Sequence, residues 1–247
     1  NCKNTIYLIM GRAFEFRKAR KMKRWSNMAK TFTRIGREII IAVKESGPDP
    51  SSNSKLRAVI QNAKTVNMPK ENIDRAIKKA SENSTENFKE VLLEGYAPHG
   101  IAIIVEAATD NNNRTVANIR SYFNKCEGNL ATSGSVDFLF SHLCFFQIKD
   151  KGINIEELEL DLIDFGVIEL SHLENEISIT GKFEDFGSIQ KELERRKIEI
   201  LSSEFEREAM VFKDLSSEDR LKVNKLINMI DEDQDVQNVY SNMKANN

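Results

Sequence analysis

The spacing of apolar residues changes near residue 87, and this change constrains the fold more than any other feature. Before it, apolar residues recur every three or four positions, as on one face of an α-helix. Beyond it, they alternate with polar residues or form short runs between turns, as in β-strands. The sequence therefore predicts a helical amino-terminal part followed by α+β structure.

Three helices are predicted between residues 11 and 82. The first follows Ser26 and ends at the turn 47–50, with one apolar face made of Met28, Phe32, Ile35, Ile39, Ala42 and Val43. The second spans 54–66. The third begins at Pro69, a residue that suits the first turn of a helix. The short connections between them predict a small three-helix domain.

The remainder is predicted to form two α/β domains, one inserted in the other. Strands at 91–96, 101–107 and 135–140 and a helix at 115–126 begin the outer domain. The order β-α-β-β-α-β between residues 145 and 205 is that of a ferredoxin-like unit. The helix at 216–231 and the strand at 236–240 are expected to return to the first sheet. The predicted parts are an extension at 1–10 outside the natural protein, a basic helical domain at 11–82, a discontinuous domain at 83–141 plus 208–247, and an inserted domain at 142–207.

The formal net charge of −2 hides a strong separation of charge along the chain. Residues 11–80 contain 18 Lys and Arg against 6 Asp and Glu, a net charge of +12. Residues 81–247 contain 17 against 32, a net charge of −15. A concentrated positive charge favours a polyanionic partner, because binding releases the counterions of the phosphates.

The segment from residue 12 to residue 25 has the highest density of positive charge. It contains seven cations and one acid, Glu15, and the rings of Phe14, Phe16 and Trp25 lie among them and could stack on unpaired bases. The simpler alternative is a helix that buries the phenylalanines and leaves its charges in water. We predict nucleic-acid contacts for Arg12, Arg17, Lys18, Arg20, Lys21, Lys23, Arg24 and Trp25.

The next helix carries basic residues on the side opposite its apolar face. At about 100° per residue, four of them fall in an arc of roughly 80°, which leaves that stripe free to bind. Ile41 interrupts the stripe. A charged face is ordinary on an amphipathic helix, but a face whose charges are almost all positive is not. We therefore add Lys30, Arg34, Arg37 and Lys44 to the predicted interface, together with Lys70, Arg75, Lys78 and Lys79 of the third helix.

Two polar strings form a second candidate site. Both could present backbone N–H groups and side-chain amides to a phosphate or a peptide, although Asn and Asp also cap helices and Gly-Ser turns also end strands. The residues concerned are Asn112, Asn113, Arg114, Thr115, Thr132, Ser133 and Ser135.

Catalytic and metal-binding patterns are weak. His99, His142 and His172 stand at no triad or metal spacing, and His142 with Cys144 gives two metal ligands where a zinc site needs four. Three cysteines without a CxxC pair fit a reducing cytoplasm, and no apolar run approaches the length of a membrane span. We expect no enzyme activity, no cofactor, no metal and no membrane partner.

Four stretches of the sequence resemble the YebC family, which includes the mitochondrial translational activator of cytochrome c oxidase. They are GRAFEFRKARKMKRWSNMAKTFTRIGR from Gly11, GPDPSSNSKLRAVIQNAKTVNMPKENIDRAIKK from Gly47, the segment from Glu94 to Phe140, and DVQNVY from Asp235. The polar strings at 112–115 and 132–135 also match motifs of the family. The chain departs from the family at its front, where many members read GHSKWANIKHRK.

The resemblance implies a helical domain and two α/β domains, one inserted in the other. Members are described as probable transcriptional regulators that bind DNA, and some as ribosome-associated factors that help translation through proline-rich stretches. We expect a regulator of gene expression that binds ribosomal RNA, since no base-reading helix can be identified and the basic segment suits irregular single strands. A DNA-binding transcriptional regulator is the alternative, and a small-molecule enzyme built on the ferredoxin-like unit is a distant one. The acidic domains could bind a protein partner.

Overall fold

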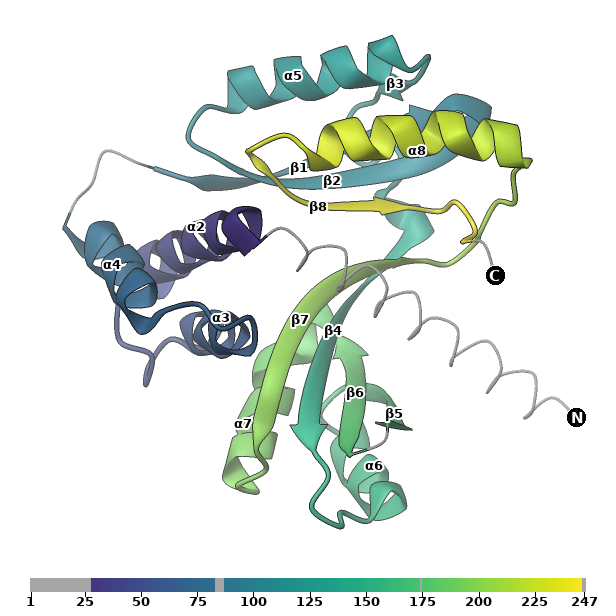
Figure 1. The fold of residues 1–247 in the computed structure, drawn as a ribbon. Coiled ribbons are helices and arrows are strands. Elements are labelled where there is room, and N and C mark those ends of the chain that lie inside the picture. Colours follow the sequence, from purple (N-terminus) through teal and green to yellow (C-terminus); the bar gives the residue numbers. More distant parts are fainter. Residues whose placement is uncertain (1–27, 83–86, 174, 246–247) are drawn as a thin grey trace, which may run out of the picture.

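The computed structural model of the chain describes residues 28–82, 87–173 and 175–245, which form a helical region and two four-stranded sheets (Figure 1). The fold class is the predicted one: α+β, with a helical amino-terminal region and two α/β parts. The second sheet is built from residues that lie between the strands of the first in the sequence. The predicted limits of the three domains stay a prediction.

The helical region contains the three predicted helices, at Met28–Ser46 (α2), Ser54–Thr65 (α3) and Lys70–Ser81 (α4). Their apolar faces meet in one core around Ile39 and Leu56, which are both fully buried. Asn53 fixes the turn between α2 and α3, because its side-chain oxygen accepts the Leu56 N–H while its amide donates to the Ala42 carbonyl. This side chain thereby satisfies backbone groups that helix ends leave unpaired.

The first sheet has the strand order β3-β1-β2-β8, in which the last strand of the chain pairs with β2 as predicted. Two helices, α5 and α8, cover one face of it (Figure 1). The hairpin between β1 and β2 turns through the short 3-10 helix η1, where His99 and Gly100 both have positive φ. The elements are β1 (Lys89–Ala97), η1 (Pro98–Gly100), β2 (Ile101–Thr109), α5 (Asn112–Lys125), β3 (Asn129–Leu130), α8 (Ser217–Asp231) and β8 (Val236–Ser241).

The second sheet has the strand order β5-β6-β4-β7, with every neighbouring pair antiparallel. Together with two helices this is the predicted ferredoxin-like order. The helices pack on the buried faces of Phe146, Ile148 and Ile179. The elements are β4 (Phe140–Lys149), α6 (Ile155–Ile163), β5 (Val167–Leu173), β6 (Glu176–Lys182), the 3-10 helix η3 (Phe183–Asp185), α7 (Phe186–Arg195) and β7 (Ile200–Ala209).

One predicted strand, at residues 135–140, is wrong over all but its last residue. An irregular turn and the 3-10 helix η2 (Asp137–Leu139) occupy this stretch, and β4 begins only at Phe140. The cause is the buried carboxylate of Glu94, which accepts three backbone N–H groups at 2.6, 2.7 and 2.9 Å, from Gly134, Val136 and Asp137. These N–H groups therefore bond to a side chain instead of a neighbouring strand.

The helical region contacts both sheets. Helix α2 lies against the segment that enters β8, where the Arg34 Nε donates to the Val236 carbonyl at 3.0 Å. Helix α3 lies against β7: the Asn62 amide donates to the Ser203 carbonyl at 2.5 Å, and the Ser203 N–H donates to the Asn62 Oδ1 at 3.1 Å. The helical region thus bridges the two α/β parts through direct hydrogen bonds.

Candidate nucleic-acid interface

The basic stripe of α2 faces the rest of the molecule at its amino-terminal end. Arg34 is 4% exposed, and its Nη2 donates to the backbone carbonyl and to the Oδ1 of Asp231, both at 3.0 Å. Lys30 donates to the same backbone carbonyl and lies 3.4 Å from the Asp231 Oδ2. Both cations are therefore bound to the carboxyl end of α8.

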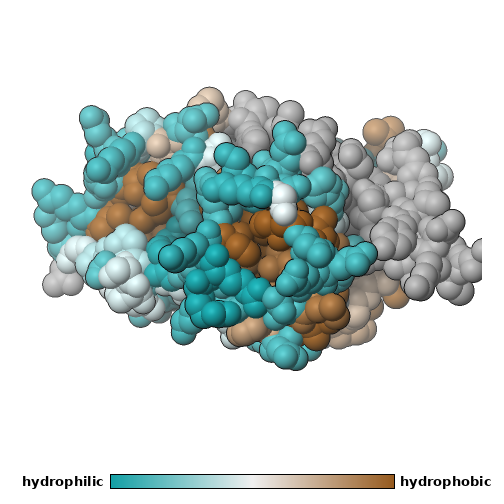
Figure 2. All heavy atoms as spheres, turned by 90° about the horizontal axis from the view of Figure 1, so that it is seen from below, coloured by the Kyte–Doolittle hydropathy of each residue, from teal (hydrophilic) through white to brown (hydrophobic). Residues whose placement is uncertain are grey.

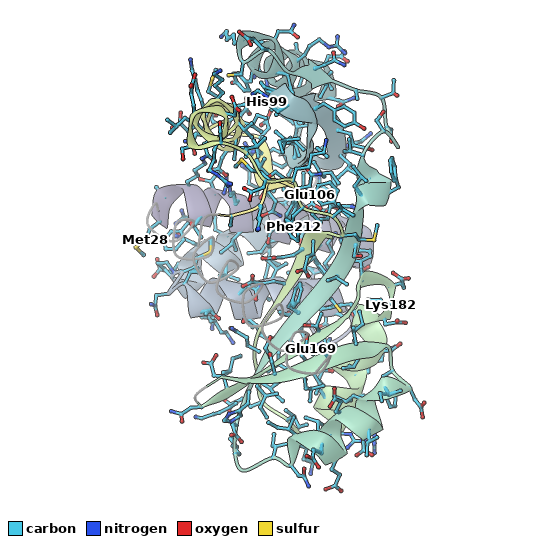
Figure 3. All side chains as sticks on the ribbon, turned by 90° about the vertical axis from the view of Figure 1, so that its right-hand side faces the viewer. Met28, His99, Glu106, Glu169, Lys182 and Phe212 are labelled. Atoms are coloured by element: carbon cyan, nitrogen blue, oxygen red, sulfur yellow. The ribbon has the colours of Figure 1, made fainter. Side chains whose placement is uncertain are left out.

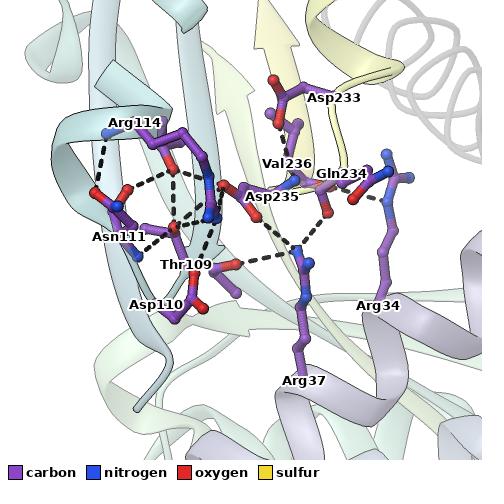
Figure 4. A network of polar contacts seen from close by, with 12 residues as sticks. Arg34, Arg37, Thr109, Asp110, Asn111, Arg114, Asp233, Gln234, Asp235 and Val236 are labelled. Atoms are coloured by element: carbon purple, nitrogen blue, oxygen red, sulfur yellow. Dashed lines mark hydrogen bonds and ion pairs between the residues drawn. The ribbon is translucent and has the colours of Figure 1, made fainter. Parts of the chain in front are cut away.

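Arg37, one turn further along α2, is bound in the same way. Its Nη1 donates to the Ala108 carbonyl at 3.1 Å and to the Gln234 carbonyl, and lies 3.3 Å from the Asp235 Oδ1 (Figure 4). The prediction that the α2 stripe is free to bind is therefore wrong for Lys30, Arg34 and Arg37. These cations were predicted to bind phosphates, but in the structure they bind carbonyl and carboxylate oxygens of residues 231–236.

The electrostatics of this contact depend on two carboxylates. Burial opposes the ionisation of Asp231 and of Asp235, but the bonded cations outweigh it and lower the pKa of both. For Asp231 the cations are Arg34 and Lys30; for Asp235, hydrogen bonds from Arg114 and Thr115 act together with the charge of Arg37. Both carboxylates are thus ionised at neutral pH and stabilise the docking of α2.

The other predicted basic residues fall into two groups. Lys44 is exposed at the end of α2, and α4 presents Lys70, Arg75, Lys78 and Lys79 on its surface, where Lys78 lies 3.6 Å from Glu82. The structure therefore leaves the α4 cations at positions that a large polyanion can approach. The remaining residues lie outside the described part of the chain: Arg12, Arg17, Lys18, Arg20, Lys21, Lys23, Arg24 and Trp25.

The first polar string is the amino-terminal turn of α5. Thr115 is fully buried and its hydroxyl donates to the Asp235 Oδ2 at 2.7 Å, while the Arg114 Nη2 donates to the same oxygen at 2.8 Å (Figure 4). A hydrogen bond from the Arg114 N–H to the Asn111 side chain caps the helix. Only Asn112 and Asn113 of this string are exposed without a role in that network.

The second string, residues 132–135, belongs to the turn that surrounds the Glu94 carboxylate. Thr132 and Ser135 lie with their hydroxyls 3.2 Å apart, and the Tyr96 hydroxyl donates to the Ser135 carbonyl at 2.9 Å. The first string is the first turn of α5, and the rest of that helix, about 15 Å long, follows it before the chain reaches the second string. The first string thus contacts Asp235 and the second contacts Glu94 and Tyr96, and these contacts are local structural ones. A binding role for either string stays a prediction.

The histidines stand apart from one another. His99 lies 3.2 Å from the Asp219 carboxylate, His172 lies 2.7 Å from that of Asp150, and His142 stacks on Phe183. The described residues contain no group of three or more His, Cys, Asp or Glu that could hold a metal ion. Among those residues, too, no helix has the length and apolar character needed to cross a bilayer.

Two structural features of this region were not predicted from the sequence. Asp231, Asp235 and Glu94 had no predicted role, yet they organise the docking of α2 and the turn before β4. A signal for the first was present, because a stripe of cations on α2 requires matching anions, and the string Asp231-Glu232-Asp233-Gln234-Asp235 supplies them. No comparable pattern marks Glu94.

Comparisons with known proteins cover almost the whole chain. A family model described as "TACO1/YebC protein N-terminal domain" matches residues 12–83, and one described as "TACO1/YebC second and third domain" matches residues 88–243. A "Probable transcriptional regulatory protein" of Flavobacterium johnsoniae is 63% identical over 235 residues, which are 95% of this chain and 99% of that protein. One of Porphyromonas gingivalis is 57% identical over 236 residues, 95% and 98% of the two chains.

A solved structure is similar as well. The crystal structure of a conserved hypothetical protein from Aquifex aeolicus superposes with a TM-score of 0.72 at 37% sequence identity. The match covers 88% of this chain and 90% of that one. The arrangement of helices and two sheets is thus shared with a protein that differs at most positions.

Proposed function

The chain belongs to the TACO1/YebC family, and on that premise we propose that it is a non-enzymatic, cytoplasmic regulator of gene expression that binds nucleic acid through its basic amino-terminal region. The observation that carries the proposal is the separation of charge, +12 over residues 11–80 and −15 over residues 81–247. A polyanion approaches the positive end and is repelled by the acidic α/β parts, so the charge sets the orientation of binding. The names of the relatives, probable transcriptional regulatory proteins, support the regulatory role.

The proposed interface contains only part of the basic residues that the sequence predicted for it. Its main part is the basic segment, residues 12–24, followed by Trp25. The surface of α4, with Lys70, Arg75, Lys78 and Lys79, extends it, as does Lys44 at the end of α2. We leave out Lys30, Arg34 and Arg37, because their charged groups already bind carbonyl and carboxylate oxygens of residues 231–236.

We favour ribosomal RNA, and therefore translation, as the target. Rings interleaved with cations suit unpaired bases and irregular backbones, and the sequence identifies no base-reading helix. The alternative is a DNA-binding transcriptional regulator, which the printed names of the relatives favour. A small-molecule enzyme on the ferredoxin-like part is the distant alternative and would require a turnover that depends on His99, His142 or Cys144.

A protein partner at the acidic parts belongs to the same proposal. Three apolar side chains of the inserted part are more than half exposed, Leu160 and Ile163 on α6 and Ile168 on β5. They lie near the acids of α6, and a view of the molecule from below shows apolar patches between hydrophilic residues (Figure 2). Apolar residues rimmed by charges are typical of a protein-binding surface.

The experiment that tests nucleic-acid binding is a salt titration of affinity. Replacing Arg17, Lys18, Arg20 and Lys21 by Ala should weaken binding of all sequences alike. It should also flatten the slope of log K against log salt by about 0.9 per lost duplex contact, or about 0.7 on single strands. The matched control removes the same charge from exposed positions of the α/β parts: Lys125, Lys149, Lys191 and Lys225. An unchanged slope in the first variant would remove the segment from the interface.

Sedimentation of a cell lysate through sucrose separates translation from transcription. Migration with ribosomes that the four-residue variant loses and the control variant keeps would support RNA. A protein that stays at the top of the gradient, and that retards one promoter fragment more than random duplex, would support the DNA alternative.

A further inference from the structure

A cleft of about 690 Å³ lies where the helical region and the two sheets meet. We call it the junction cleft. Its walls come from α2 and α3, from the first sheet, and from β7 and η3 of the inserted part. Glu106, on the face of the first sheet that points to β4 and β7, marks its position (Figure 3). The volume is within the range of about 300–1,000 Å³ that is usual for ligand-binding clefts.

The junction cleft is strongly acidic. Seven glutamates line it against two cations, Lys55 and Arg207, so the formal charge of the described residues around it is −5. Both cations are already paired: Lys55 lies 2.9 Å from Glu90, and Arg207 lies 2.9 Å from Glu106. Burial and the charge of Arg207 lower the pKa of His142, which leaves that ring neutral at pH 7. Low-dielectric walls strengthen such a field, which attracts cations.

A second observation points to a ligand. Gln237 of β8 lines the junction cleft and is 7% exposed, yet neither atom of its side-chain amide has a hydrogen-bond partner within the described region. The hydroxyl of Ser203, from the opposite wall, is buried and unpaired as well. Buried polar groups are nearly always hydrogen-bonded, so unpaired ones in two residues that line the same cleft indicate that a further polar group belongs there.

One wall of the junction cleft is aromatic. Phe183 is 41% exposed and stacks on His142, with ring centroids 3.7 Å apart, and its other neighbour is the ring of Phe205 at 5.1 Å. Aromatic rings beside carboxylates are a favourable environment for guanidinium and ammonium groups. The chemistry of the cleft therefore fits a chain that carries several such groups and a polar backbone.

The same chain contains a segment of that chemistry next to the cleft. Residues 11–25 hold seven Lys and Arg against one Glu, a net charge of +6. Their connection enters α2 at Met28, and Thr31, one turn into that helix, already lines the cleft. Arg24 is four residues from Met28, which allows a span of at most about 14 Å. The segment is therefore tethered at the mouth of the junction cleft at an effective concentration on the order of millimolar.

We propose that the basic segment, residues 12–24, docks in the junction cleft of its own chain through contacts of its Lys and Arg with the cleft glutamates. The docked state does not depend on nucleic acid. If the proposed function holds, a polyanion has to displace the segment from the cleft. The cleft therefore competes with the nucleic-acid target for the segment, and this competition selects against polyanions that bind weakly and nonspecifically.

Trp25, the one tryptophan of the sequence, reports docking because it directly follows the segment. The test compares acrylamide quenching and the emission maximum of Trp25 in the full chain and in the variant Glu38→Gln/Glu184→Gln/Glu206→Gln. Docking predicts that the variant's emission shifts to longer wavelength and that its quenching constant rises to that of a synthetic peptide of residues 11–27. High salt should produce the same change in the unaltered chain, because it screens the contact.

The matched control is Glu127→Gln/Glu156→Gln/Glu218→Gln, which removes the same charge from exposed positions that do not line the cleft. It should behave like the unaltered chain, and circular dichroism checks that both variants are folded. Equal quenching in all three proteins would overturn the proposal.

Carbodiimide cross-linking gives a second readout that needs no variant. The reagent joins a lysine amine to a carboxylate in direct contact, so Lys18, Lys21 or Lys23 should be linked to Glu184, Glu204 or Glu206. A mixture of isotopically light and heavy chains identifies the source of the segment. Links within one chain support the proposal, whereas links between light and heavy chains, or links only to carboxylates outside the cleft, overturn it. Both tests omit nucleic acid, so their failure is distinct from a failure of the proposed function.

Discussion

Replacement of Arg34 by Met tests whether the arginines of α2 hold the molecule together or bind nucleic acid. Methionine keeps most of the apolar stem of the side chain and removes the guanidinium. Arg34 donates hydrogen bonds to the carbonyl of Val236 and to the carbonyl and carboxylate of Asp231, each at 3.0 Å. If the structural role is right, the variant loses the docking of α2 on the segment that enters β8.

The size of the loss follows from these bonds. Asp231 keeps Lys30 as a cation partner, so its charge does not become isolated. The Asp231 carbonyl keeps the Lys30 amine as a donor, whereas the Val236 carbonyl loses the guanidinium, and a buried acceptor left without its donor costs about 1–3 kcal/mol. The hydrogen bond to the charged Asp231 carboxylate is lost as well, which costs about 1.5–3 kcal/mol, and we therefore expect a total loss of about 3 kcal/mol.

Hydrogen exchange followed by mass spectrometry measures this locally. A loss of about 3 kcal/mol corresponds to roughly 150-fold faster exchange of the protected amides of α2 and β8, at 1.36 kcal/mol per factor of ten. The control is Arg75→Met on the exposed face of α4, which should leave exchange unchanged. Combining Arg34→Met with Asp231→Asn in a double-mutant cycle isolates the energy of this pair.

A loss below about 1 kcal/mol, the value of an exposed ion pair, would refute the reasoning. So would a variant with unchanged exchange whose salt dependence of nucleic-acid binding falls by one contact. That second result would restore Arg34 to the interface from which the structure removes it.

Three further predictions concern the acids and a thiol. Glu94→Gln places an amide donor against the N–H groups of the turn before β4. It should lower the free energy of unfolding in urea by about 2–3 kcal/mol and make the amides of residues 131–139 exchange faster. An unchanged urea midpoint would contradict this. Folding lowers the pKa values of Asp231, Asp235 and Glu94. The stability that these carboxylates supply is therefore complete above their pKa values in the unfolded chain, and it is lost as the pH falls through their pKa values in the folded chain. Urea midpoints should be level from about pH 7 to pH 5 and drop below that, by less in Arg34→Met. Burial raises the pKa of the Cys144 thiol to about 12, so a thiol reagent at pH 8 should modify it only in urea, which peptide mass spectrometry detects.

The secondary structure and topology were largely predictable from the sequence because periodicity reports burial. The six elements of the ferredoxin-like part and the return of β8 to the first sheet follow from alternation, short apolar runs and the need for partners. The strand predicted at 135–140 failed because its apolar residues resemble a strand, while the carboxylate that bonds its backbone is some 40 positions earlier. A local pattern holds no information about so distant an acceptor.

The candidate site was less predictable, for a related reason. The angular position of Arg34 and Arg37 opposite the apolar face was correct, but a helix in a multidomain chain can pack on both faces. Whether a charged stripe meets water or another part of the protein depends on tertiary contacts, here with residues 231–236. A net positive charge near the front of the chain is a property of composition, whereas the availability of each cation is a property of the fold.

The contact between Asn62 and β7 has a consequence for the solubility of the chain. Strand β7 is at an edge of its sheet, and the amide of Asn62 occupies the N–H and the carbonyl of Ser203 that a further strand would use. An uncovered edge recruits strands of other molecules and so begins aggregation. Selection can therefore maintain an asparagine at this position to keep copies of the protein apart in a crowded cell, whatever the protein binds.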